Sequence, residues 1–148
     1  DRFVSSCLEY GMKASRARKN HLRDCSMDIK LFWKDVLSQN QRSLQGYFHE
    51  DAVIRWHCSN ELFTVSEYIR ANCEYPGQWA GKIERIEETA DLIITAVRVF
   101  PKDHSSSFHV VNFCKIENGL IVEMDEYWSD DGAAPEWRRR MSIGKPIR

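Results

Sequence analysis

The chain has 148 residues, of which 43% are hydrophobic and 29% are charged, and its formal net charge is −1. This composition is typical of one soluble globular domain with a core of its own, and it requires no second domain. Apolar runs such as residues 92–94 are far shorter than the roughly 20 residues of a membrane helix, and no apolar stretch of signal-peptide length occurs. We therefore expect neither a membrane partner nor secretion.

The cysteines and the charges indicate the cellular location and the class of partner. The five cysteines form no CxxC pair, which predicts neither a disulfide framework nor a zinc site and favours a cytoplasmic location. Basic residues gather in residues 1–26, where six Lys and Arg stand against three Asp and Glu. Such a charge run is usually solvated, and no nucleic-acid-binding motif accompanies it, so a nucleic acid partner is not expected.

A first helix is predicted to begin at Met27 and to end near Gly46. Apolar residues recur there at helical spacing: Ile29, Phe32, Trp33, Val36, Leu37 and Leu44. Ser26 or Asp28 would cap its start. Residues 13–26, by contrast, show almost no apolar periodicity. We therefore expect residues 1–26 to be a basic N-terminal extension and residues 27–148 to form the domain.

The rest of the chain is mostly strand. Residues 52–58 predict a short strand, rich in β-branched and aromatic side chains. Thr64, with Glu67 three residues later, predicts a capping box and a helix that runs to about Cys73. Four further strands are expected at residues 79–88, 92–100, 107–116 and 120–128. This order predicts an α+β domain whose helices cover one face of a curved, mostly antiparallel sheet.

The last two strands predict a hairpin, because Asn118-Gly119 is the preferred sequence of a type I′ turn. Counting outward from Glu117 opposite Leu120 gives three more pairs: Phe113 with Met124, Val111 with Glu126, and His109 with Trp128. Because side chains alternate along a strand, these residues would share one face. A carboxylate and an imidazole would then lie one diagonal apart, either on an active-site wall or on an exposed patch.

This element order, with FHEDAVIRWH after the first helix and NGLIVEMDEYW at the last hairpin, resembles the nuclear transport factor 2-like superfamily, and within it the SnoaL-type, polyketide-cyclase-like group. The segments FTVSEYIRANCEYPGQW and DEYWSDDGAAPEWR are similar to those of uncharacterised bacterial members. The resemblance covers roughly residues 27–128. It implies a cone-shaped half-barrel in which the sheet wraps around the N-terminal helices and leaves a central pocket. It also implies a homodimer that forms through the outer face of the sheet.

Known enzymes of this superfamily include ketosteroid isomerases, limonene-epoxide hydrolases and polyketide cyclases, which place acid/base residues on pocket-facing strands without a metal or cofactor. By this resemblance, Glu126 stands where the epoxide hydrolases carry a catalytic aspartate before an aromatic pair. An apolar pocket would raise the pKa of its carboxyl toward neutrality, as a general acid/base needs. The alternative for Glu126 is a surface carboxylate at a strand end.

Two further residues are candidates for chemistry. His109 would share a proton with Glu126 from a diagonal cross-strand position, unless it is a structural histidine. Arg98 would anchor an anion or an oxyanion, since a buried cation needs such a partner. The resemblance places the arginine and aspartate of the epoxide hydrolases near Ala96 and Arg98.

Ligand contacts are expected from aromatic and imidazole side chains: Trp56, His57, Trp33, Phe113 and Trp128. Only one of the neighbours Trp56 and His57 can point inward. By the resemblance, Trp56 stands where the isomerases carry their base aspartate, so it would form a pocket wall and His57 would lie at the rim. Aromatic residues on a helix stripe or strand face are otherwise plain core.

Two functions are consistent with these residues. The first is a domain that binds a small apolar organic molecule and performs cofactor-free acid/base chemistry of the isomerase, cyclase or epoxide-hydrolase type. The second is a non-catalytic ligand-binding or dimerisation module. No metal is expected, because Asp125, Asp130 and Asp131 lack the loop pattern of calcium ligands. A Glu126 inside an open pocket would favour the enzyme, and a Glu126 facing solvent beside a filled cavity would favour the module.

Overall fold

A computed structural model describes residues 27–148, so the predicted basic extension at residues 1–26 lies outside the described residues. The elements in chain order are α2 (Ile29–Leu37), α3 (Gln41–Leu44), the 3-10 helix η1 (Gln45–Tyr47), β1 (Phe48–Trp56), β2 (Glu61–Phe63), α4 (Val65–Cys73), β3 (Trp79–Glu88), β4 (Leu92–Pro101), β5 (Phe108–Glu117), β6 (Leu120–Asp130) and α5 (Glu136–Arg140). None of these helices is long and apolar enough to cross a membrane.

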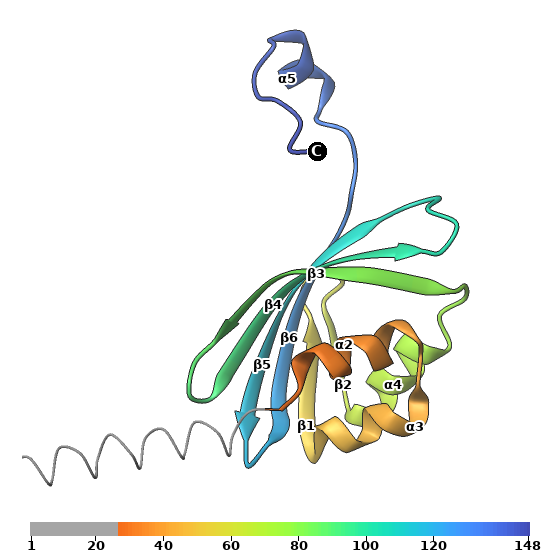
Figure 1. The fold of residues 1–148 in the computed structure, drawn as a ribbon, viewed down its shortest axis with the longest axis vertical. Helices are drawn as coiled ribbons and strands as arrows, with labels where there is room; N and C mark the ends of the chain where they lie inside the picture. The colour runs from red at the N-terminus through yellow and green to blue at the C-terminus, as the bar shows by residue number, and fades with distance from the viewer. Residues whose placement is uncertain (1–26) are drawn as a thin grey trace, which may run out of the picture.

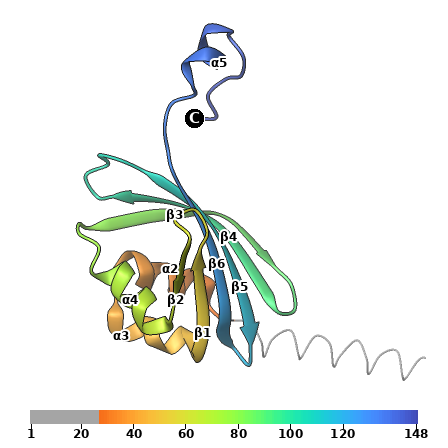
Figure 2. The same ribbon diagram turned by 180° about the vertical axis from the view of Figure 1, so that it is seen from behind.

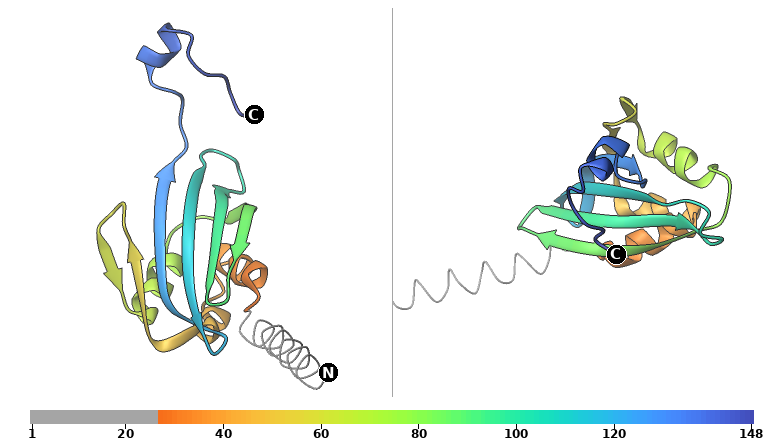
Figure 3. Two further views of the ribbon diagram at one scale, coloured as in Figure 1. Left: turned by 90° about the vertical axis from the view of Figure 1, so that its left-hand side faces the viewer. Right: turned by 90° about the horizontal axis from the view of Figure 1, so that it is seen from above.

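The strands form one six-stranded sheet in the order β2-β1-β6-β5-β4-β3. The β1–β6 pair is parallel, and the other neighbouring pairs are antiparallel. Helices α2, α3 and α4 gather on one face of the sheet, which bends around them (Figures 1 and 2). The strands can be followed by colour in Figure 3, where the segment after β6 carries α5 away from the sheet. The α+β architecture predicted from the sequence is confirmed.

The predicted first helix is split in two. The side chain of Asp28 caps α2 by accepting from the backbone N–H of Leu31 at 2.9 Å. Gln39 then adopts a φ of 54°, which ends the helix, and the side chain of Asn40 caps α3 by accepting from the N–H of Ser43 at 3.3 Å. The prediction of one helix to Gly46 was wrong because helical periodicity continues across this capped break.

The capping box predicted for α4 is confirmed. The N–H of Glu67 donates to the Thr64 hydroxyl at 3.3 Å, and the N–H of Thr64 donates to the Glu67 carboxylate at 3.1 Å. Both bonds satisfy donors that a helix start would otherwise leave unpaired. The helix therefore begins and ends where the sequence indicates.

The β5–β6 hairpin has the predicted turn but not the predicted register. Asn118 and Gly119 have φ values of 50° and 75°, and Glu117 lies opposite Leu120. Beyond Ile116 and Ile121 the register shifts, because Lys115 pairs with Glu123 and leaves Val122 as the extra residue of a β-bulge. One extra residue moves every later side chain to the other face, so Asn112, not Val111, lies opposite Glu126.

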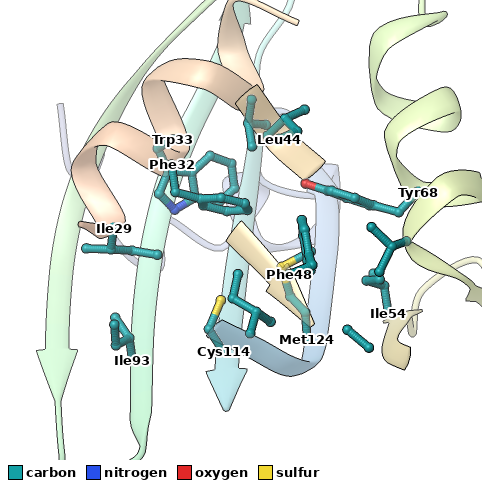
Figure 4. Packing of buried hydrophobic residues seen from close by; sticks show 14 of the residues in the cluster. Ile29, Phe32, Trp33, Leu44, Phe48, Ile54, Tyr68, Ile93, Cys114 and Met124 are labelled. Carbon is teal, nitrogen blue, oxygen red and sulfur yellow. The ribbon is translucent and has the colours of Figure 1, made fainter. Parts of the chain in front are cut away.

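The core lies between the helices and the inner face of the sheet. Figure 4 shows Phe32 and Trp33 from α2 and Leu44 from α3 above Phe48 and Met124. All five side chains are buried. The Phe32 ring meets the Trp33 and Phe48 rings edge-on, at centroid distances of 5.8 and 6.0 Å. Burying side chains of this size contributes about 1.5–3 kcal/mol each to folding, so this aromatic layer holds the helices on the sheet.

Candidate functional site

A pocket with a volume of about 550 Å³ opens at one end of the molecule, where α2, α4, β1 and β6 end and β3 and β5 begin. Five aromatic side chains line it: Trp56, Tyr75, Trp79, Phe108 and Trp128. Val36 and Leu37 from the end of α2 and Val99 from β4 add aliphatic surface. Segments far apart in the sequence therefore converge on one mostly apolar cavity.

The aromatic side chains form two groups. Trp56 of β1 and Trp128 of β6 lie with their ring centroids 6.3 Å apart at an interplanar angle of 61°. Trp79 is flanked by Tyr75 at 5.4 Å and by Phe108 at 6.0 Å. Edge and tilted contacts at these distances are favourable beyond the area they bury. Each group is therefore held together by its own ring contacts.

Polar side chains tie the helix ends together at the pocket. The Gln39 amide donates to the backbone carbonyls of Asn72 at 3.0 Å and Tyr75 at 2.7 Å. The Asn72 amide donates to the carbonyl of Val36 at 3.1 Å. These bonds join the end of α2 to the end of α4, so the pocket edge is fixed by side chain to backbone contacts.

Glu126 lies buried beside this pocket and is not one of the residues that line it. The residue is 1% exposed, and its carboxylate accepts from Trp128 Nε1 at 2.6 Å and from Asn112 Nδ2 at 3.3 Å. Burial raises the pKa of the carboxyl to about 7, and the two hydrogen bonds only partly oppose this rise. Glu126 is therefore neither a surface carboxylate nor a residue of the open pocket. It is buried, and its hydrogen bond to Trp128 connects it to the pocket wall.

A row of polar side chains crosses the inner face of the sheet at this level. Thr95 of β4 pairs with Asn112 of β5, which pairs with Glu126 of β6, and these three are the buried polar residues of the described chain. Trp33 Nε1 donates to the Thr95 hydroxyl at 2.9 Å, and the Cys114 thiol donates to the Asn112 side-chain oxygen at 2.9 Å. Each of these three buried polar side chains thus has a partner, as a core requires.

Sequence reasoning missed Asn112 and Thr95. The available signal is a polar residue inside an otherwise apolar alternation: Thr95 stands between Ile93 and Val97, and Asn112 between Val110 and Cys114. A polar side chain on a buried strand face needs a partner, so such an interruption points to a hydrogen-bonded network.

His109 lies on the outer face of the sheet. Its imidazole contacts Asp131 through Nδ1 and Glu84 through Nε2, the latter at 2.5 Å, and it makes no hydrogen bond to Glu126. The predicted contact between His109 and Glu126 was wrong because the bulge at Val122 turns the two side chains to opposite faces.

Arg98 and Phe113 also lie on the outer face and do not line the pocket. Arg98 pairs with His109 across β4 and β5, and its guanidinium lies 5.2 Å from the Phe100 ring centroid. Arg98 therefore does not line the aromatic pocket, and its role as an anion or oxyanion anchor stays a prediction. The odd-numbered residues of β4 fill the core, so its even-numbered residues, Arg98 included, point outward.

The two neighbours Trp56 and His57 point to opposite faces, as alternation requires. His57 contacts Asp125 at 2.7 Å and stacks on the Tyr127 ring at 4.4 Å, against which the Phe113 ring also packs at 6.0 Å. Trp33 is 1% exposed and belongs to the core. Of the five predicted ligand contacts, the structure places only Trp56 and Trp128 in the pocket wall.

Two buried hydrogen-bond donors in the described chain have no partner. Nε1 of Trp56 and Nε of Arg98 are buried and have no hydrogen-bond partner. Each costs about 1–3 kcal/mol relative to a paired donor. Within residues 27–148, no group of three or more His, Cys, Asp or Glu side chains is arranged to hold a metal ion.

No protein-family model matches the sequence, and the search of curated proteins gave no match. Solved structures match well. An NTF-2 like protein of unknown function from Burkholderia xenovorans aligns over 88% of this chain and 98% of its own, with a TM-score of 0.67 and 20% identity. A candidate ketosteroid isomerase from Kribbella flavida aligns over 79% and 84%, with a TM-score of 0.66 and 18% identity.

A candidate SnoaL-like polyketide cyclase from Shewanella putrefaciens is more distant, with a TM-score of 0.55 and 9% identity over 66% of this chain and 74% of its own. At these identities the similarity concerns the fold. Both the bent sheet and the helices on its inner face are those that the sequence resemblance implies. The chain therefore has the cone-like α+β fold of the nuclear transport factor 2-like superfamily.

Proposed function

We propose that this chain binds a small, largely apolar organic molecule in the aromatic pocket. The observation that carries the proposal is a cavity of about 550 Å³ walled by five aromatic side chains. Ligand pockets typically measure roughly 300–1,000 Å³ and combine apolar walls with a few polar groups. The aromatic side chains border this cavity rather than fill it, which argues against a purely structural core.

The test is a ligand screen by thermal shift and tryptophan fluorescence, since Trp56, Trp79 and Trp128 line the cavity. Ala71 of α4 also lines it, so Ala71→Phe should fill the pocket and weaken binding at least tenfold. Ser66→Phe places the same side chain on an exposed position of the same helix and should leave binding unchanged. Binding that survives Ala71→Phe would place the ligand elsewhere and refute the proposal.

A second candidate is cofactor-free acid/base catalysis of the isomerase, cyclase or epoxide-hydrolase type. The observation that favours it is Glu126, whose pKa of about 7 suits proton transfer near neutral pH. Glu126 is buried and does not line the pocket, so the reaction would require side chains around it, such as the Trp128 indole that binds its carboxylate, to move. Two solved structures of this fold are described as a candidate isomerase and a candidate cyclase, which supports a search for such substrates.

Glu126→Gln tests this second candidate. It should abolish turnover of any substrate found while leaving its binding to the pocket intact, and the wild-type rate should change with an apparent pKa near 7. Turnover that persists in the variant would remove Glu126 as the acid/base and leave ligand binding as the function.

We also propose a cytoplasmic homodimer that forms through the outer sheet face. Val111 and Tyr127 lie opposite each other on this face and are 38% and 44% exposed. Apolar side chains that lie side by side in water favour association. Light scattering of Val111→Lys should then show a monomer, whereas Lys34→Met, a change at an exposed position of α2 on the other side of the sheet, should leave the dimer intact. A monomeric wild-type chain would contradict the proposal.

A further inference from the structure

We infer that the ligand of the aromatic pocket carries a positive charge, as a small tertiary or quaternary ammonium compound does. This inference rests on the proposed function and names the chemical class of the ligand. It follows from three properties of the wall: its aromatic rings, its two carboxylates that form no ion pair, and its hydrogen-bond donors, most of which already bind protein acceptors.

Five aromatic rings line the wall. Trp56 and Trp128 form one aromatic group, and Tyr75, Trp79 and Phe108 form the other. The face of an aromatic ring is electron-rich and attracts a cation within about 6 Å of its centroid, with tryptophan the strongest and the effect largest where water is excluded. Quaternary ammonium ions suit such walls because they are large, apolar at their methyl groups and weakly hydrated.

The charged residues of the wall are all acidic. Glu61 and Asp130 line the pocket, and no described Lys, Arg or His does so. Neither carboxylate forms an ion pair with any residue of the described part of the chain. No described cation forms an ion pair with them, so their charge at the pocket attracts a cation and repels an anion.

The two carboxylates belong to the two aromatic groups. Glu61 of β2 pairs with Trp56 of β1, and Asp130 of β6 pairs with Phe108 of β5. Cross-strand partners have Cβ atoms about 4.5–5.5 Å apart. Each group of rings thus has a carboxylate next to it, which is the arrangement that an ammonium ion between the rings would require.

Most of the side-chain N–H donors of the wall are already engaged, and Nε1 of Trp56 is the one that has no partner. Trp128 Nε1 donates to Glu126, and Trp79 Nε1 donates to the carbonyl of Pro76 at 3.1 Å. The amides of Gln39 and Asn72 donate to backbone carbonyls. A carboxylate or phosphate ligand needs several free donors, and this wall offers it few. The pocket therefore favours a cation, because its charged residues are acidic and because it offers an anion few free hydrogen-bond donors.

Isothermal titration calorimetry with two isosteric pairs tests the inference. The pairs are 4-trimethylammoniophenol with 4-tert-butylphenol, and choline with 3,3-dimethyl-1-butanol, each pair differing only in a quaternary nitrogen or carbon. The cation of each pair should bind at least about fivefold more tightly than its neutral partner. The preference should shrink with added salt, because Glu61 and Asp130 are exposed.

Variants of the two carboxylates test whether their charge, rather than the shape of the pocket, causes the preference for cations. Glu61→Gln combined with Asp130→Asn should lower the affinity for the cations several-fold and leave the affinity for the neutral compounds unchanged. The matched control is Glu50→Gln with Asp51→Asn, which removes two exposed carboxylates that do not line the pocket, and it should change neither affinity.

The possible failures are distinguishable. If the neutral compounds bind as tightly as the cations, or if the double variant leaves the preference intact, the inference of a cationic ligand is overturned while the pocket remains a small-molecule site. If none of the four compounds binds at millimolar concentration, both the inference and the proposed function are contradicted.

Discussion

Trp128 donates its indole N–H to the carboxylate of Glu126, two residues earlier on the same face of β6, at a distance of 2.6 Å. The indole belongs to the pocket wall, whereas the carboxyl is buried and does not line the pocket. One hydrogen bond therefore joins the surface that a ligand would touch to a buried group that titrates near neutral pH. A ligand that displaces this indole would remove a bond that lowers the pKa of Glu126.

Stability should fall as pH rises through the titration of Glu126. Its pKa is about 7 in the folded chain against a usual value of 4.5, so the folded state holds a proton that the unfolded state releases between these pH values. The free energy of unfolding therefore contains a contribution that is complete below pH 4.5 and is lost progressively up to about pH 7. A tenfold change in proton affinity corresponds to about 1.4 kcal/mol, so the loss is about 3 kcal/mol.

Urea unfolding of wild type and Glu126→Gln from pH 4 to pH 9 measures this contribution. The difference in unfolding free energy should shift in favour of the variant by about 3 kcal/mol between pH 4.5 and pH 8. Glu117→Gln, at an exposed position beside the hairpin turn, should keep the wild-type dependence. Parallel pH curves for wild type and Glu126→Gln would show that the carboxyl does not titrate as stated.

Trp128→Phe should raise the pKa of Glu126 further. The indole bond favours the ionised carboxylate, and its loss leaves that carboxylate buried with one partner fewer. The variant should lose about 2 kcal/mol of unfolding free energy at pH 8, where the carboxylate is charged, and less at pH 5. Carbon-13 NMR of the glutamate carboxyl carbons gives the titration directly. Trp137→Phe in the exposed α5 should change neither quantity, and an unchanged titration in Trp128→Phe would contradict the assignment.

The sequence could predict the features that depend on residues close together in the chain. The Thr64–Glu67 capping box and the Asn118-Gly119 turn depend on residues within three positions of each other, and both occur as predicted. The split between α2 and α3 was not predicted although its cap, Asn40, is also local, because apolar spacing continues through it. Periodicity reports which residues face the core, and it does not report whether the helix between them is continuous.

The bulge in β6 could not be predicted because its cause is tertiary. Leu120, Val122 and Met124 alternate as one apolar face, which is the pattern of a regular strand. In the fold, Ile121 and Met124 are both fully buried, and the extra residue Val122 allows this. That single residue decides that Glu126 faces Asn112 in the core and that His109 faces outward, so the candidate site could not be assembled from a count along the hairpin.

His109→Ala should leave the pocket unaffected. The imidazole bridges Glu84 and Asp131 on the outer face, with all three side chains about one-third exposed or less. Surface pairs of this kind contribute about 0–1 kcal/mol to stability, so the unfolding free energy should fall by no more than that. The affinity of any pocket ligand should stay within twofold of wild type. A loss of affinity as large as that expected for Ala71→Phe would mean that the two faces of the sheet are coupled.

Gly81→Ala should destabilise the fold at the pocket edge. A Cβ at this position of β3 would lie 2.8 Å from the carbonyl oxygen of Arg98 and 2.9 Å from Cδ1 of Leu37, which lines the pocket. The backbone carbonyl cannot move aside without disturbing β4, so overpacking should cost about 1–3 kcal/mol.

Gly46→Ala is the matched control, because a Cβ there meets nothing within 4 Å, and it should be neutral or stabilising by up to about 1 kcal/mol. Chemical denaturation of both variants at pH 6 measures the contrast. Equal stabilities would show that β3 does not pack this closely on α2, and the pocket wall at Leu37 would then be looser than described.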